Sequence, residues 1–106
     1  MRIAVQSVPD LGLVVRSVRR TSKIRLDDLA ATAGVSKQFA SDVEHGKPTV
    51  QLGLVLKLLS ELGVPLTLDI PDEAQKEMAY QRSKGVRPHA KRKNATINQP
   101  RKPSIA

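Results

Sequence analysis

Residues 25–46 limit the possible folds of this chain more than any other stretch, because they read as two short helices joined by a tight turn. One apolar helix face has the spacing i, i+3, i+4, i+7, at Leu26, Leu29, Ala30 and Ala33. Gly34 follows at once, where a helix end needs a residue that tolerates a left-handed backbone. Ser36 is a good N-cap, because its hydroxyl oxygen can accept a hydrogen bond from a free amide of the next helix.

The second predicted helix has a narrow apolar face at Phe39, Ala40 and Val43, and it ends at Gly46. Polar side chains are left facing outward near its start: Ser36, Lys37, Gln38 and Ser41. This layout predicts a helix-turn-helix, whose second helix lies in the major groove of DNA with its N-terminal residues on the bases. We therefore expect these four side chains to contact base edges.

The four candidates differ in what they can read. Lys37 can reach the O6 and N7 atoms of guanine, and Gln38 can bond the N6 and N7 atoms of adenine. Ser36 and Ser41 can reach bases or phosphates, although Ser36 can equally be an N-cap and nothing more.

Two segments between Leu29 and Gly46 match the patterns LAxxAGVS and SxxExG, which resemble the XRE/Cro-type repressor family. The resemblance runs from about Leu11 to Leu68. The segments EHGKPTVQL and LGVPLTL make the chain similar to the HipB-like antitoxins of that family. The resemblance implies a mainly α, four-to-five-helix repressor-like domain. Its last helix leads into a short C-terminal β-strand, and the strands of two subunits form one sheet.

The same resemblance implies an ion pair between Arg19 and Glu44. This pair connects the first helix of the domain to the second helix of the helix-turn-helix, the recognition helix that contacts the bases. Without a partner, an acid at the end of a helix that faces phosphates would repel DNA. The family usually has a glutamine at the position of Leu26, where it touches a phosphate. This chain lacks that contact, and we expect Arg25 to replace it.

The first helix is predicted to begin at Pro9-Asp10, with Asp10 as its N-cap. Basic side chains lie outside its apolar stripe, as expected of a helix that crosses the DNA backbone. For any one of these side chains, a solvated basic face is the competing interpretation. The predicted phosphate contacts are Arg16, Arg20, Arg25 and Lys47.

Residues 52–62 carry two adjacent apolar stripes, more than four or five short helices need internally. We interpret this surface as a homodimer contact, with deeper burial in one core as the alternative. Residues 64–70 then alternate in the way that predicts a strand. Such a strand must pair with residues 2–6, with the same strand of a second copy, or with both. The predicted dimer interface is Leu58, Leu62, Leu66, Leu68 and Ile70.

The net charge of +8 favours a polyanionic partner, nucleic acid first. Residues 1–71 hold 9 basic and 7 acidic side chains (+2), whereas residues 72–106 hold 9 basic and 3 acidic ones (+6). We expect residues 1–71 to form the DNA-binding and dimerisation domain. Residues 72–106 are expected to be a flexible basic tail, with a weak helix over residues 72–81. The basic run 91–93 then touches DNA, docks on an acidic partner, or is simply solvated.

The chain has no cysteine, and no apolar run approaches the ~20 residues of a membrane span. Two histidines and no glycine-rich phosphate loop leave little for catalysis, so we expect no enzyme activity, cofactor or metal site.

The leading hypothesis is a cytoplasmic, nucleoid-associated repressor that binds a palindromic operator in double-stranded DNA as a homodimer. The resemblance adds an antitoxin role: the protein binds a HipA-like Ser/Thr kinase toxin and autoregulates their operon. The alternative is a stand-alone XRE-family regulator without a toxin partner.

Overall fold

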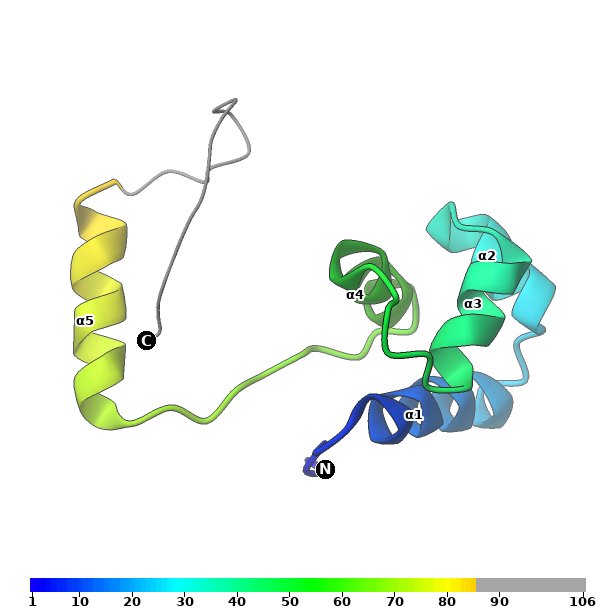
Figure 1. The fold of residues 1–106 in the computed structure, drawn as a ribbon, viewed down its shortest axis with the longest axis horizontal. Helices are drawn as coiled ribbons and strands as arrows, with labels where there is room; N and C mark the ends of the chain where they lie inside the picture. Colours follow the sequence, from blue (N-terminus) through cyan, green and yellow to red (C-terminus); the bar gives the residue numbers. More distant parts are fainter. Residues whose placement is uncertain (86–106) are drawn as a thin grey trace. The chain divides into compact units, whose positions relative to one another are not determined.

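The structure is a computed structural model, and it describes residues 1–85 of the chain. Contacts divide the chain into two units, Met1–Thr67 and Leu68–Ala106. The first unit holds helices α1 (Val8–Thr21), α2 (Leu26–Ala33), α3 (Lys37–Glu44) and α4 (Leu52–Glu61), and the second holds α5 (Asp72–Ser83) (Figure 1). The expectation of a mainly α fold with four to five helices is confirmed. The domain boundary after residue 71 stays a prediction, and the basic run 91–93 lies outside the described residues.

Helix α1 begins earlier than predicted. Its N-cap is Ser7, whose hydroxyl oxygen accepts the N–H of Asp10 at 3.2 Å, and the Asp10 carboxylate accepts the N–H of Gln6 at 3.1 Å. The prediction that Asp10 caps this helix is wrong. Pro9 lies inside the first turn rather than before it, because N–H groups there have no partner within the helix and proline lacks one.

The turn between α2 and α3 has the predicted form. Gly34 ends α2 with a left-handed φ of 74°. The hydroxyl oxygen of Ser36 accepts the N–H of Phe39 at 2.9 Å and so caps α3. Val35, between them, is half-buried and packs against the core.

The core of the first unit is drawn from all four of its helices. Helix α1 packs against α3, α3 against α2, and α2 against α4 (Figure 1). Three of the core residues are alanines of α2 and α3, whose small side chains let these helices approach closely. The buried apolar residues, none more than 3% exposed, are Val15, Leu29, Ala30, Ala33, Ala40, Val43, Val55, Leu58 and Leu59.

Helix α4 buries one apolar face and leaves another exposed. Leu58 is 0% exposed and belongs to the core, so its predicted place in a dimer interface is wrong. The sequence pattern missed this because the two stripes of α4 are adjacent and equally apolar. The exposed leucines of this helix are instead Leu52 and Leu56.

Residues 64–70 form no strand within the described part of the chain, and neither do residues 2–6. The N–H of Val64 donates to the carbonyl of Leu59 at 2.9 Å and so completes the end of α4. No backbone hydrogen bond within residues 1–85 involves residues 65–69. The predicted strand is therefore not confirmed, and its pairing with a second copy stays a prediction.

Helix α5 was expected to be weak and to end by residue 81, but it runs to Ser83. All of its residues are exposed. Its own charges and side chains support it locally: Asp72 and Glu73 lie in the first turn and Arg82 in the last, which suits the helix dipole. Part of the segment expected to be a flexible tail is therefore helical.

Candidate DNA-binding surface

The start of α3 presents the predicted base-contacting residues. Ser36 and Gln38 are exposed, the Lys37 side chain is 65% exposed, and Ser41 is half-buried one turn further on. The Ser36 hydroxyl already accepts the capping hydrogen bond from Phe39. The Ser41 hydroxyl lies 3.4 Å from the Nδ1 atom of His45, which is 2.8 Å from the Ser41 carbonyl.

The end of α3 is pressed against α1 at two glycines. A Cβ atom at Gly12 would lie 2.4 Å from the Val43 carbonyl oxygen and 2.8 Å from that of Glu44. Gly46 has φ 76°, and a Cβ atom there would lie 2.7 Å from the Cα atom of Pro9. No larger residue fits at Gly12 unless the two helices move apart, so this contact fixes the position of α3 on α1.

An ion pair between Arg19 of α1 and Glu44 of α3 reinforces that contact. The Nε atom of Arg19 donates to Oε2 of Glu44 at 2.6 Å, and its Nη2 atom donates to Oε1 at 3.0 Å. The third nitrogen, Nη1, donates to the carbonyl of Ile24 at 3.0 Å. The side chains are only 15% and 4% exposed. The hydrogen bond that Arg19 donates to Glu44 raises the pKa of Arg19 above its ordinary value, against the lowering effect of burial.

Asp27 of α2 forms a salt bridge with Lys37, one of the residues predicted to contact bases. Nζ of Lys37 lies 2.9 Å from Oδ1 of Asp27, and Nη2 of Arg25 lies 3.6 Å from Oδ2 of the same carboxylate. The hydrogen bond and the positive charge of Lys37 lower the pKa of Asp27, with a smaller contribution from Arg25. The spacing in the sequence did not reveal this contact, because it crosses the turn between two helices.

Asp42, within α3 itself, accepts a hydrogen bond from Gln38, another residue predicted to contact bases. The Nε2 atom of Gln38 donates to Oδ1 of Asp42 at 2.8 Å, and Nζ of Lys47 lies 3.6 Å from Oδ2. Gln38 and Asp42 are four residues apart on one helix, a spacing at which such side chains bond. This signal was present in the sequence and was missed.

The other predicted contact residues are dispersed. Arg16 is half-buried and Arg20 exposed on α1, and neither makes a salt bridge within residues 1–85. Among the predicted dimer residues of the first unit, Leu62 is half-buried and Leu66 is 50% exposed. In the second unit, Leu68 is 80% exposed and Ile70 half-buried.

Metal-binding clusters and membrane spans are both missing from the part of the chain that the structure describes. Residues 1–85 contain no group of three or more His, Cys, Asp or Glu side chains able to hold a metal ion. None of the helices α1 to α5 is long and apolar enough to cross a membrane.

Comparison with known proteins agrees with this geometry. The profile of the family described as Helix-turn-helix (HTH_3) matches residues 15–68. The uncharacterized HTH-type transcriptional regulator y4mF of Sinorhizobium fredii (strain NBRC 101917 / NGR234) is 42% identical over 72 residues. That match covers 68% of this chain and 95% of the relative.

Solved structures share the fold at lower identity. The structure titled "HipB-O4 20mer complex" superposes with a TM-score of 0.61 at 21% identity, over 67% of this chain and 100% of the other. The structure titled "Structure of HipA-HipB-O2-O3 complex" gives a TM-score of 0.62 at 21% identity, over 67% and 100%. At this identity the likeness concerns the fold.

Proposed function

The chain belongs to the helix-turn-helix family HTH_3, and from this premise we propose that it is a sequence-specific DNA-binding repressor. The observation that carries the proposal is the arrangement of α3. One side of this helix is fixed to α1 by the close contact at Gly12 and by the Arg19–Glu44 pair. The start of the helix presents Lys37 and Gln38 to solvent, as a helix that enters the major groove requires.

In this proposal base recognition and phosphate binding are carried out by different side chains. Lys37 and Gln38 read base edges, with Ser41 beside them and Ser36 holding the helix start. Four cations around them contact phosphates and supply most of the salt-dependent affinity: Arg16, Arg20, Arg25 and Lys47. Glu44 faces Arg19 rather than the DNA, which removes a repulsive charge from the binding surface.

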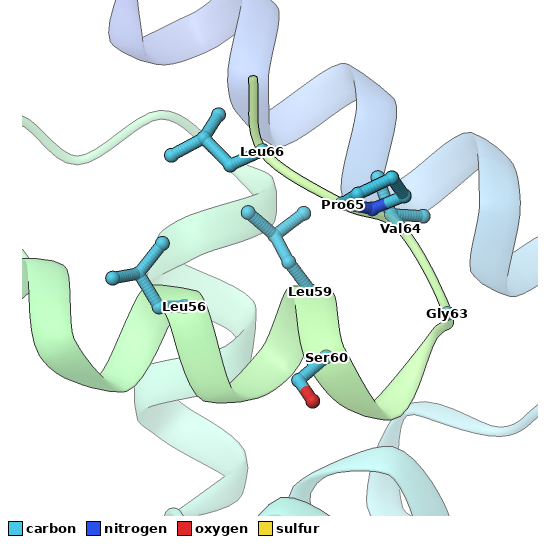
Figure 2. Close-up of a pocket in the computed structure, with 7 residues that line it drawn as sticks. All are labelled: Leu56, Leu59, Ser60, Gly63, Val64, Pro65 and Leu66. Atoms are coloured by element: carbon cyan, nitrogen blue, oxygen red, sulfur yellow. The ribbon is translucent and has the colours of Figure 1, made fainter. Parts of the chain in front are cut away.

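We further propose that two copies bind a palindromic operator. A shallow apolar groove of about 430 Å³ lies between α4 and the chain after it, lined by Leu56, Leu59, Ser60, Gly63, Val64, Pro65 and Leu66. Figure 2 shows Leu59 pointing from α4 toward the segment that carries Leu66. Two features support pairing with a second copy: the apolar surface at Leu56 and Leu66, and the backbone of residues 65–69, which makes no backbone hydrogen bond within residues 1–85.

The antitoxin role is the finer part of the proposal. The chain would bind a HipA-like Ser/Thr kinase toxin in the cytoplasm and repress their shared operon on the nucleoid. Support comes from the likeness in fold to HipB, which one solved structure holds together with HipA. The alternative is a stand-alone regulator, and the relative at 42% identity, which is described only as a transcriptional regulator, favours it.

The DNA-binding proposal is tested by a nuclease footprint of the purified protein on the DNA upstream of its own gene. Experiments use near-physiological salt and excess competitor DNA. We expect two protected half-sites related by symmetry, about 10 bp apart or a multiple of that. Lys37→Ala and Gln38→Ala should each weaken operator binding by about 1–3 kcal/mol and relax base preference locally. Unstructured coating that disappears with salt would contradict the proposal.

The antitoxin proposal needs a separate experiment. The tagged chain is purified from its native host, and co-purifying proteins are identified by mass spectrometry and assayed for Ser/Thr kinase activity. A kinase whose activity falls on adding the purified chain is the expected result. Repeated purification of the chain alone, with an intact footprint, would favour the stand-alone regulator.

A further inference from the structure

Lys37 and Gln38, two of the four residues predicted to contact bases, are each held by a carboxylate in the DNA-free protein. Lys37 is held by Asp27 at 2.9 Å, and Gln38 donates to Asp42 at 2.8 Å. In each case the carboxylate uses its Oδ1 atom for the base reader. The recognition helix therefore has a defined arrangement of its reading side chains before it meets DNA.

The second oxygen of each carboxylate faces a cation. Oδ2 of Asp27 lies 3.6 Å from Arg25, and Oδ2 of Asp42 lies 3.6 Å from Lys47. Both cations are predicted phosphate contacts. Exposed pairs at such distances are weak, so a DNA phosphate can take the cation from the carboxylate.

From these two networks we propose that Asp27 and Asp42 are specificity-determining residues of the DNA-binding surface. Asp42 positions Gln38 for base reading, Asp27 competes with DNA for Lys37, and both carboxylates lower the affinity for DNA of arbitrary sequence. This inference rests on the proposed function, because it assumes that the start of α3 reads bases.

Asp42 acts on the orientation of the Gln38 amide. The amide nitrogen has two hydrogens, and donation of one to Asp42 leaves one hydrogen and the carbonyl oxygen. These are the donor and acceptor that the N7 and N6 atoms of adenine require. The reversed amide would bring its oxygen against a carboxylate oxygen, and two acceptors repel one another. A fixed amide cannot present two donors to guanine, so Asp42 favours adenine.

Asp27 acts by lowering the affinity for DNA sequences that offer no acceptor to Lys37. When Lys37 leaves Asp27 for a guanine, the base edge replaces the lost hydrogen bond. On a sequence without that acceptor, Lys37 either stays with Asp27 or loses a partner without gaining one. The negative charge of Asp27 also opposes nearby phosphates on every sequence. Specificity is a difference of affinities, and a penalty on wrong partners raises it as effectively as a gain on the right one.

The test begins with the full-length protein and a duplex library with a random central segment. Selection and sequencing give the preferred site. Fluorescence anisotropy then measures the Kd for that site and for duplexes in which each base pair is replaced. The variants are Asp27→Ala and Asp42→Ala, each checked for folding by circular dichroism.

Asp28→Ala is the matched control. Asp28 lies beside Asp27 in the first turn of α2, is exposed, and its carboxylate makes no hydrogen bond or salt bridge within residues 1–85. All three variants lose one negative charge, so each should bind arbitrary DNA more tightly. Only Asp27→Ala and Asp42→Ala should lose discrimination between the preferred site and replaced sites, by about three- to tenfold, the size of a lost hydrogen bond.

A double variant separates positioning from a general charge effect. If Asp42 acts through Gln38, then Asp42→Ala should change base preference in the unsubstituted protein but not in the Gln38→Ala background. Equal discrimination by all three aspartate variants would overturn the inference while leaving the proposed function intact. Failure of the unsubstituted protein to enrich any sequence would overturn the proposed function itself.

Discussion

At the scale of single residues, the candidate DNA-binding surface contains three pairs in which a carboxylate accepts a hydrogen bond from a cationic or amide side chain. Three acids do this in different surroundings: Glu44 is buried, Asp42 is half-buried and Asp27 is exposed. Burial decides how much each pair contributes to stability, because water screens exposed charges. The buried pair should therefore matter for folding, and the exposed pairs for the arrangement of side chains at the surface.

Replacing Glu44 by alanine should lower the free energy of unfolding by about 3 kcal/mol, the low end of the range for breaking a buried ion pair. The low end applies because Arg19 stays 15% exposed and can regain some hydration. Urea unfolding followed by circular dichroism measures this change. Glu61→Ala, at the exposed end of α4, is the control and should change the free energy of unfolding by less than about 0.5 kcal/mol. Equal effects of the two substitutions would mean that the Arg19–Glu44 pair does not stabilise the fold.

The Asp27 carboxylate should titrate at a pKa below its ordinary value of 3.8, because Lys37 favours its charged form. The stabilisation from this pair is present above the ordinary pKa and is lost as the pH falls through the lowered one. It is therefore complete at neutral pH. Lys37→Ala should return the pKa of Asp27 toward 3.8, as carbon-detected NMR titration would record. Arg25→Ala is the comparison and should have a smaller effect, since Arg25 is a minor cause.

At the scale of helices, the sequence predicted local features better than features that depend on packing. Gly34 and Ser36 mark the turn because their backbone and capping preferences act within a few residues. The Arg19–Glu44 pair was expected only through family resemblance, since nothing local links residues 25 positions apart. Leu58 was misplaced because two apolar stripes on α4 look alike until the packing partner is known. Helix α5 is an exception to this rule: its support is local and electrostatic, but its lack of an apolar face led to the prediction of only a weak helix.

Gly12→Ala should separate α1 from α3. The new Cβ atom would meet backbone oxygens at 2.4 and 2.8 Å, and backbone cannot move aside as a side chain can. We expect a loss of about 1–3 kcal/mol in the free energy of unfolding, typical of an overpacked site. DNA affinity should also fall for the molecules that remain folded, because α3 is displaced.

Gly53→Ala provides the matched control for that substitution. Gly53 lies in α4 with nothing within 4 Å of an added Cβ atom, so alanine should stabilise the helix by about 0.5–1 kcal/mol. Chemical unfolding and anisotropy titrations on both variants make the comparison. If Gly12→Ala were as stable and as active as Gly53→Ala, the close contact would not determine the position of α3.

At the scale of the whole molecule, charge and apolar surface are distributed unequally along the chain. Residues 1–71 carry a net charge of +2, although they contain the predicted reading surface. Specific binding by this part then depends on where its cations lie, more than on their number. Apart from Leu13 on α1, the exposed leucines of residues 1–85 lie on α4 and in the chain after it, which is where we place a second copy.

Leu66→Asp should convert the proposed dimer into a monomer. Leu66 lines the groove beside α4, is 50% exposed and is not part of the core, so the variant should still fold. Sedimentation equilibrium measures the molecular mass, and the midpoint of thermal unfolding should lose its dependence on protein concentration. Leu13→Asp is the control, because Leu13 is 54% exposed on α1 and does not line that groove. A monomeric unsubstituted protein, or a dimer that tolerates Leu66→Asp, would contradict the interface.

The short sequence separation between the packed helices has a kinetic consequence. Helices α2 and α3 are joined by a three-residue turn at residues 34–36, and α1 and α2 are joined by the four residues 22–25. Helical domains rich in such local contacts fold in microseconds to milliseconds. A reading surface built this way can re-form quickly after a thermal opening. Because the core includes α4, it can also form during synthesis once residue 61 has left the ribosome, before the basic C-terminal third of the chain has emerged.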